Sequence, residues 1–103
     1  MLAGTTSTYD GEASNFVVAT SGHTGITVAS TGSGKRTNLY FADGTSGTAA
    51  YAGGFTYDHN NNTLLVRTAS SEIARFTTTG LTFNGDTAAA NALDDYEEGT
   101  WTP

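Results

Sequence analysis

The chain contains no cysteine, and this absence excludes a disulfide framework and thiol chemistry. Lysine and arginine number only 4 against 10 aspartates and glutamates, so the formal net charge is −6. Because nucleic-acid binding needs clustered cationic side chains, we expect no nucleic-acid partner. No run approaches the roughly 20 apolar residues of a membrane-spanning helix, and the first five residues do not resemble a signal peptide, so we expect no membrane insertion.

Large apolar side chains are also scarce. Leucine, isoleucine, valine and phenylalanine together make up 17 of the 103 residues. This share is below roughly 20 %, the limit under which highly charged chains are usually disordered. Disorder of that kind also requires high net charge, whereas only 14 % of the residues are charged, and the alternating runs predict order. A domain of this length buries about 60–68 % of its unfolded surface. A solitary chain therefore has little margin of stability, and we expect it to associate with copies of itself.

Glycine is abundant, with 13 residues, while proline occurs once. Glycine and asparagine turn signals divide the chain into short runs that are rich in β-branched and aromatic residues. This pattern predicts an all-β fold of short antiparallel strands joined by Gly/Asn turns. The expected strands are residues 15–20, 26–29, 38–41, 55–58, 63–67, 72–77 and 81–83.

The turn signals differ in strength. Asp43-Gly44 and Gly53-Gly54 are predicted turns, and the run of three asparagines at 60–62 predicts a hairpin tip, because asparagine tolerates the left-handed region. Ser70-Ser71 is expected to break the chain again. Asn84-Gly85 is the strongest two-residue hairpin signal in the sequence.

Period-2 alternation indicates which side chains share a face. Phe55 and Tyr57 lie on one face of their strand, as do Leu64 and Val66, so a hairpin would align the four as one apolar stripe. The strand at 72–77 has apolar residues of both parities, which indicates that both of its faces are covered. The residues predicted to pack in the core or between chains are Ile26, Val28, Leu39, Phe41, Phe55, Tyr57, Leu64, Val66, Ile73, Phe76, Leu81 and Phe83.

We divide the chain into an N-terminal arm or connector at 1–14, a β-rich module at 15–86 and an acidic connector at 87–103. Alanines 88–90 favour a short helix near 87–95, which Asp86 or Thr87 would cap, and an extended linker is the alternative, because the segment is too short to be a stable helix unaided. The carboxylates that follow are Asp94, Asp95, Glu97 and Glu98. We interpret them as a solvated connector instead of a catalytic pair, because no second polar cluster supports catalysis.

Two other motifs fail on spacing. Residues 32–36 suggest a phosphate-binding loop, but Ala29 stands where that motif needs glycine and Arg36 stands where it needs serine or threonine. Residues 58–62 begin like a calcium loop, but Thr63 replaces the required glycine and Ala69 the required glutamate. His59 remains a candidate metal ligand if three copies meet on an axis. We predict no cofactor, no metal ligand and no catalytic residue, and therefore no enzyme.

Part of the chain resembles a known family. The string LYFADGTSGTAAYAGGFTYDHNNNTLLVRTASSEIARF, followed by TGLTFNG, is similar to a module of phage tail fibres and related virion proteins. In that family a YFADGTSG-like strand and turn precede a YDH-asparagine hairpin and an E-x-x-R strand. The similarity covers roughly residues 22–85. The closing ALDDYEEGTWTP resembles a connector of phage structural proteins that precedes a further β domain, so we expect the chain to continue beyond Pro103.

The resemblance implies an intertwined or side-by-side homotrimer that forms a segment of a virion tail fibre or filament. Such a segment would space or present a receptor-binding tip, in contact with other virion proteins. The alternative is a carbohydrate-binding adhesin module, in which Tyr40, Tyr51 and Trp101 stack on glycans of the host surface. Aromatic side chains displayed in a groove would favour the adhesin, and aromatic side chains buried between strands or chains would favour the structural role.

The failed metal spacings generate a first prediction. Because residues 58–62 lack two elements of a calcium loop, treatment with a chelator should leave the melting temperature unchanged. Thermal unfolding followed by circular dichroism tests this. A drop of several degrees that calcium, zinc or iron reverses would contradict the prediction and would implicate Asp58 or His59.

Overall fold

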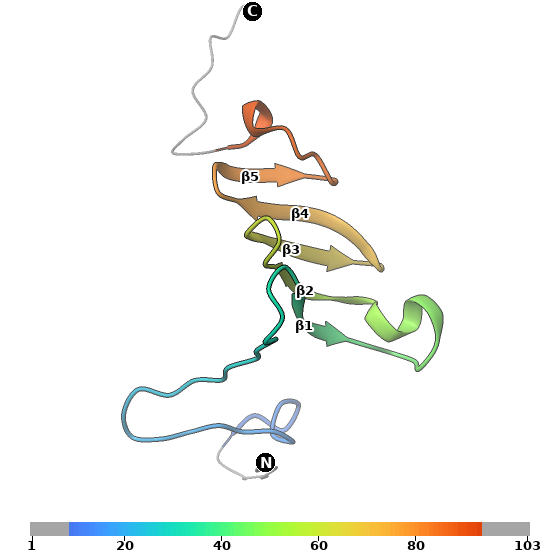
Figure 1. Ribbon diagram of the computed structural model, residues 1–103. Helices are drawn as coiled ribbons and strands as arrows, with labels where there is room; N and C mark the ends of the chain where they lie inside the picture. Colours follow the sequence, from blue (N-terminus) through green and yellow to red (C-terminus); the bar gives the residue numbers. More distant parts are fainter. Residues whose placement is uncertain (1–8, 94–103) are drawn as a thin grey trace, which may run out of the picture.

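The computed structural model describes residues 9–93, and its centre is a single antiparallel sheet (Figure 1). This confirms the all-β prediction. The five strands are β1 (Arg36–Phe41), β2 (Gly53–Asp58), β3 (Thr63–Thr68), β4 (Ser71–Thr77) and β5 (Gly80–Phe83). Two short 3-10 helices accompany them, η1 (Gly47–Tyr51) between β1 and β2, and η2 (Ala89–Asn91) after β5.

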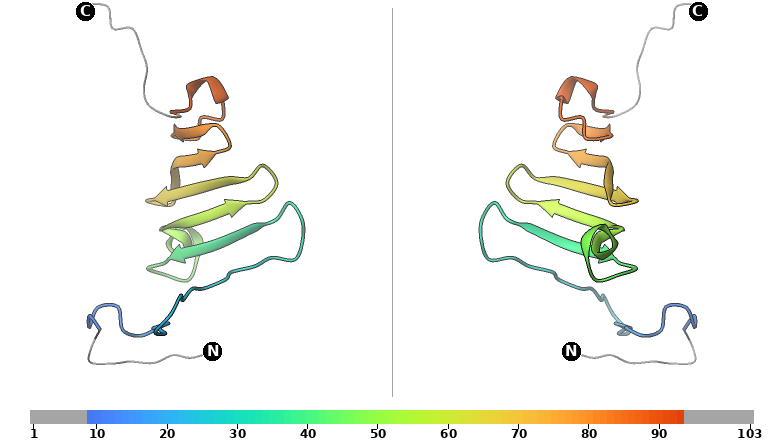
Figure 2. Two further views of the ribbon diagram at one scale, coloured as in Figure 1. Left: turned by 90° about the vertical axis from the view of Figure 1, so that its left-hand side faces the viewer. Right: turned by 90° about the vertical axis from the view of Figure 1, so that its right-hand side faces the viewer.

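The strands follow one another in space in the same order as in the sequence, β1-β2-β3-β4-β5. Each strand therefore pairs only with its neighbours in the sequence, as Figures 1 and 2 show. The chain enters this stack at β1 and leaves it at β5. Among residues 9–93, no helix is long and apolar enough to cross a membrane.

Five of the seven predicted strands are confirmed, and the two N-terminal ones are wrong. Residues 15–20 and 26–29 lie outside the sheet and have no strand partner within residues 9–93. The prediction that Ile26 and Val28 point inward is also wrong for the single chain, because their side chains are 67 % and 57 % exposed. Alternation predicts an extended backbone, but a strand also needs a neighbouring backbone, and the described part of the chain does not bring one alongside.

The predicted turn at Gly53-Gly54 is also wrong, because these glycines are the first two residues of β2. Gly54 has φ +139, and a Cβ atom added there would lie 2.2 Å from the carbonyl oxygen of Leu39. The glycine is therefore needed because the β1 backbone approaches closely, and not because the chain turns.

The turn between β3 and β4 lies one residue earlier than predicted. Ala69 and Ser70 both have positive φ, 47° and 66°, and form a two-residue hairpin loop. Ser70 anchors this loop to the region around η1. Its amide donates a hydrogen bond to the carbonyl oxygen of Ala52 (2.8 Å), and its hydroxyl donates one to that of Thr48 (3.0 Å).

The β4 strand contains a bulge. Val66 pairs with Ala74 while Arg67 pairs with Glu72, so Ile73 is an extra residue without a partner on β3. A bulge shifts the alternation of the strand by one residue. As a result Glu72 and Arg75 project from the same face, although they are three positions apart. Ile73 is 44 % exposed in the single chain, so it is not a core residue there, and its predicted packing between chains stays a prediction.

Asn84 and Gly85 both have positive φ, and the amide of Asp86 donates to the carbonyl oxygen of Phe83 (3.1 Å), which confirms a turn. No strand follows it within the described residues. The predicted helix near 87–95 is reduced to η2, and a single bridge then pairs Leu93 with Leu81. The carboxylate of Asp86 accepts hydrogen bonds from the Ala88 amide (2.9 Å) and from the Asn91 side chain (2.8 Å), which lower its pKa.

Gly54 offers a test of the packing of β1 against β2. Gly54→Ala should lower the free energy of unfolding by at least about 2 kcal/mol, because the new methyl group would collide with the Leu39 carbonyl oxygen and strain the backbone. Gly22→Ala is the control, since a Cβ atom there meets nothing within 4 Å. Equal stability of the two variants in urea titrations would contradict the described register.

Candidate assembly surface

One face of the sheet is apolar over all five strands. Cross-strand pairing aligns Leu39, Phe55, Val66, Ala74 and Phe83 in one row, because each is the partner of the next. A second row beside it is formed by Tyr57, Leu64, Phe76 and Leu81, and Phe41 extends the face at the end of β1. We call these ten residues the apolar face. The pairs Phe55–Val66 and Tyr57–Leu64 confirm the predicted stripe.

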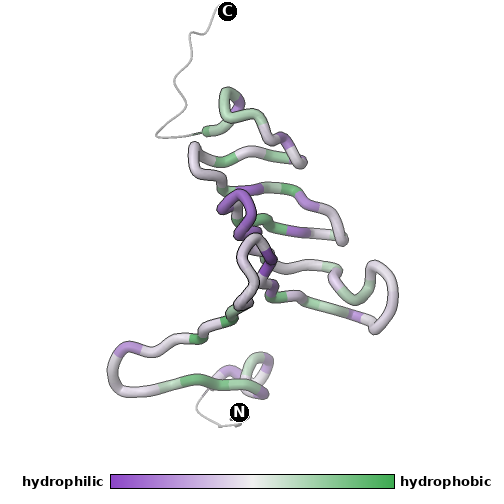
Figure 3. Tube along the Cα trace, viewed as in Figure 1, coloured by the Kyte–Doolittle hydropathy of each residue, from purple (hydrophilic) through white to green (hydrophobic). Residues whose placement is uncertain are grey.

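The apolar face is open to solvent in the single chain. Six of its side chains, Leu39, Phe41, Phe55, Tyr57, Phe76 and Phe83, are between 36 % and 57 % exposed. Hydrophobic and hydrophilic residues are mixed along the sheet, as Figure 3 shows, so this exposure is not a result of uniform composition. In folded proteins, a contiguous exposed apolar surface that spans a whole sheet is a common feature of interaction sites.

Few large apolar side chains are fully covered within the single chain. Within the described residues, Leu65 is the one large apolar side chain that is fully buried, at 4 % exposure. The single chain therefore has almost no core of its own.

Leu65 was not among the residues predicted to pack. It projects from the opposite face to Val66, where Thr56 and Arg75 are its cross-strand partners. Long side chains such as arginine cover apolar neighbours with their aliphatic stems. The consecutive leucines at 64 and 65 were the available signal, because one of them must lie on each face of a strand.

The opposite face is polar. Thr56 and Thr82 are buried on it, and the Thr56 hydroxyl donates a 2.7 Å hydrogen bond to the side-chain oxygen of Asn38. This arrangement suits a face whose periphery contacts water, because its buried hydroxyl groups are small and its larger groups, apart from Leu65 and Tyr40, are charged or amide side chains. We call it the polar face.

The ion pair between Glu72 and Arg75 is the strongest electrostatic contact on the polar face. Arg75 donates from Nε (2.6 Å) and from a terminal nitrogen (2.7 Å) to the two carboxylate oxygens of Glu72. The hydrogen bond from Arg75 lowers the pKa of Glu72, and the carboxylate in turn raises the pKa of Arg75. The β4 bulge makes this two-point contact available, because it brings both side chains to one face.

A second ion pair joins β1 to the hairpin tip. Arg36 Nε donates to the carboxylate of Asp58 at 3.1 Å, while the Asn60 amide donates to the other oxygen at 3.0 Å. The Asn60 amide is the main cause of the lowered pKa of Asp58, and Arg36 lowers it further. Both oxygens of Asp58 thus have protein partners that hold the tip in place.

The loop residues considered for metal binding do not form a cluster. Within residues 9–93, no group of three or more histidine, cysteine, aspartate or glutamate side chains lies close enough together to hold a metal ion. His59 packs against Tyr57, with ring centroids 4.8 Å apart, at the edge of the sheet. The acidic residues of the connector, Asp94, Asp95, Glu97 and Glu98, lie outside the described residues.

Two of the three tyrosine and tryptophan side chains considered for glycan stacking lie side by side. Tyr40 and Tyr51 are partly exposed, their ring centroids are 6.2 Å apart, and their planes are tilted by 46°. The tilt prevents the two rings from forming one flat platform. Trp101 lies outside the described residues.

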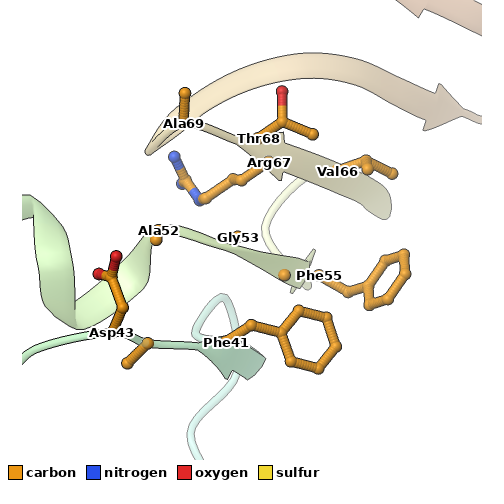
Figure 4. A pocket seen from close by; sticks show the side chains of 11 residues that line it. Phe41, Asp43, Ala52, Gly53, Phe55, Val66, Arg67, Thr68 and Ala69 are labelled. Carbon is orange, nitrogen blue, oxygen red and sulfur yellow. The ribbon is translucent and has the colours of Figure 1, made fainter.

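An open hollow of about 610 Å³ lies where β1 and β3 end and β2 begins, next to Phe41 and Phe55 (Figure 4). The rings of these two residues meet edge to face, with centroids 6.4 Å apart. On the other side of the hollow, Arg67 has a buried Nε with no hydrogen-bond partner in the described structure. The lining is mostly apolar and carries no convergent set of polar groups, so the hollow fits a side chain better than a substrate.

The Glu72–Arg75 pair generates a pH prediction. Because the pKa of Glu72 is lowered in the folded state, its contribution to stability is present above the unfolded pKa, near 4.5, and is lost as the pH falls through the lower folded value. Glu72→Gln should therefore lower the free energy of unfolding by about 1–2 kcal/mol at pH 7, and by less at pH 3.

The control for this variant is Glu12→Gln, which removes the same charge at an exposed position outside the sheet. Urea titrations at pH 7 and pH 3 give the comparison. If Glu72→Gln destabilised the protein equally at both pH values, the ion pair would not be the source of the effect.

Comparisons with known proteins leave the function to be argued from this geometry. No protein-family model, no curated protein and no solved structure matches the chain.

Proposed function

We propose that this chain is a structural segment of a phage tail fibre or a related virion filament, and that it assembles with copies of itself through the apolar face. The exposure of that face over all five strands is the observation that carries the proposal. In this role the segment spaces or presents a receptor-binding tip and belongs to the virion.

Self-association would bury side chains that a single chain leaves in water. Full burial of a large apolar side chain contributes about 1.5–3 kcal/mol to stability. The exposed members of the apolar face are roughly half-buried in the single chain, so about half of this free energy is still available to an assembly. A second copy is the occupant that fits best, because it offers an apolar surface of the same extent. The polar face, with its two ion pairs, would then remain in contact with water.

The order of the strands favours a filament over a compact oligomer. The described chain enters the stack at β1 and leaves it at β5, the opposite end (Figures 1 and 2). A module with its entrance and exit at opposite ends can be placed in series with other modules along one axis. The apolar face runs the full length of the stack, so contacts between copies would continue along the same axis.

The proposed oligomer is a homotrimer. This number comes from the resemblance of residues 22–85 to tail-fibre modules, and the geometry is compatible with it, because three sheets can turn their apolar faces toward a common axis and close a ring. We propose no enzymatic activity. The carboxylates with lowered pKa values on the sheet, Asp58 and Glu72, are both engaged in ion pairs, so their environment has a structural explanation.

A carbohydrate-binding role is a second candidate, and the exposed pair Tyr40 and Tyr51 is the observation that favours it. Tyr40 follows Asn38 by two positions and thus projects from the polar face, which self-association would leave free. A glycan array separates the candidates, with a Tyr40→Ala, Tyr51→Ala double variant as the control. Binding that this variant abolishes would support the adhesin, and no binding would favour the purely structural role.

The proposal predicts that folding and assembly are a single event. Val66→Asp places a charge in the central row of the apolar face, at a cost of several kcal/mol if that row is buried without a partner for the charge. We expect an unfolded or aggregated chain with no stable intermediate. Asn38→Asp is the matched control, because it adds the same charge on the polar face and keeps the oxygen that accepts from Thr56.

Analytical ultracentrifugation and circular dichroism distinguish the outcomes. The unmodified chain and Asn38→Asp should sediment as the same oligomer. A folded, soluble monomer of Val66→Asp would overturn the coupling of folding to assembly, and a monomeric unmodified chain at all concentrations would overturn the proposed function.

A further inference from the structure

The segment at residues 25–30 lies outside the sheet and has no strand partner among the described residues. Within the described residues it makes no backbone hydrogen bond, and a Cβ atom at Gly25 would meet nothing within 4 Å. Its side chains nevertheless alternate as in a half-buried strand, because Ile26 and Val28 are separated by Thr27. We call residues 25–30 the free strand. A backbone with unpaired polar groups and exposed β-branched side chains is suited to pair with another strand.

Val28 of the free strand adjoins the apolar face. It borders a shallow hollow of about 150 Å³ whose other walls include Leu39, Phe55, Tyr57 and Leu64, all members of the apolar face. The apolar side chains of the free strand thus lie close enough to the apolar face to take part in the same contact between copies. Ile26 remains exposed, at 67 %.

The sheet has one open edge at the same end. β1 forms its ladder with β2 alone, so the backbone groups along its other side have no strand partner in the described chain. The edge at the far end of the stack differs, because Leu93 already bridges to Leu81 there through two hydrogen bonds of 2.8 Å. An unpaired edge is a template for the addition of a strand from another chain.

We infer that in the assembled protein the free strand of one copy pairs with the β1 edge of an adjacent copy. This inference rests on the proposed self-association, and it selects an intertwined assembly over a side-by-side one. Copies arranged around an axis along the stack lie at the same height. A strand that leaves its own sheet at the β1 end therefore meets the β1 edge of its neighbour, and not the β5 edge.

The path of the chain favours a neighbour over its own β1. In Figure 2 the chain that precedes β1 diverges from that strand and continues beyond the end of the sheet. The connection at residues 31–35 includes Gly34 in the left-handed region, with φ +72, which sets the direction in which the chain departs. Copies can exchange an identical segment when the connection that joins it to the sheet directs the segment away from its own sheet. The exchange would cover the β1 edge and extend the buried apolar rows by Ile26 and Val28.

Hydrogen–deuterium exchange on the unmodified protein tests the pairing. Amides of residues 25–30 should exchange at least tenfold more slowly than those of the loop at 31–34, because every second amide of the free strand would donate to β1. Sedimentation of the same sample reports the oligomer. An oligomer in which residues 25–30 exchange as fast as the loop overturns this inference and leaves the proposed function standing, whereas a monomer overturns both.

Isotope-filtered nuclear Overhauser spectra identify the chain that supplies the edge. Labelled and unlabelled chains are refolded together, and contacts are sought between the methyl groups of Ile26 or Val28 in one chain and the β1 amides of another. Intermolecular contacts are expected. If these contacts occur only within one chain, the free strand pairs with its own β1 and the inference is wrong.

A variant gives an independent readout. Thr27→Pro removes one backbone donor from the centre of the free strand, and it should raise the exchange rates of residues 25–30 at least tenfold and lower the melting temperature of the assembly. Thr27→Ala keeps the donor and serves as the matched control. If Thr27→Pro leaves both quantities as they are in Thr27→Ala, the free strand is not paired and the inference fails.

Discussion

The register of the five strands is the constraint on which the other features of this protein depend. Because side chains alternate with a period of two, a slip of one residue in any ladder would move an entire strand's apolar set to the other side of the sheet. The observed register places the phenylalanines of the sheet, Phe41, Phe55, Phe76 and Phe83, on one face. Gly54 protects this register at β1, because its missing side chain lets the Leu39 carbonyl approach. The hairpin tip at Asp58 and the turn at Ala69-Ser70 hold the next ladder at its two ends.

The β4 bulge reconciles the apolar register with the charge pattern of the strand. Strict alternation would send Glu72 and Arg75 to opposite faces and would place one charged side chain among the phenylalanines. The extra residue, Ile73, shifts the alternation, so both charges lie on the polar face and form a two-point ion pair. The E-x-x-R spacing is thus explained by a local geometry that keeps the apolar face free of charge. Bulges commonly serve to redirect a side chain in this way.

The sheet has one open apolar face, and Leu65 is the single fully buried large apolar side chain among residues 9–93, so the sheet is an incomplete structure when it stands alone. The proposed assembly would cover two exposed parts of the sheet. The apolar faces of the copies would cover one another, and the free strand of one copy would cover the β1 edge of the next. These two contacts are physically different. The first is a hydrophobic contact without strong directionality, and the second is a directional ladder of backbone hydrogen bonds. Together they would give a filament both its stability and its alignment.

Local chemistry in the sequence was enough to predict the all-β class, five strands, the asparagine hairpin tip and the stripe of Phe55, Tyr57, Leu64 and Val66, because turn residues and alternation act over a few positions. It was not enough for features that depend on another part of the backbone. Residues 15–20 and 26–29 have the composition of strands, but pairing requires a neighbour, and the part of the chain that the structure describes does not supply one. Gly53-Gly54 has the composition of a turn, yet the approach of β1 makes it the start of a strand. The bulge at Ile73 and the burial of Leu65 were likewise decided by tertiary structure, because both result from the way β3 and β4 align across the sheet.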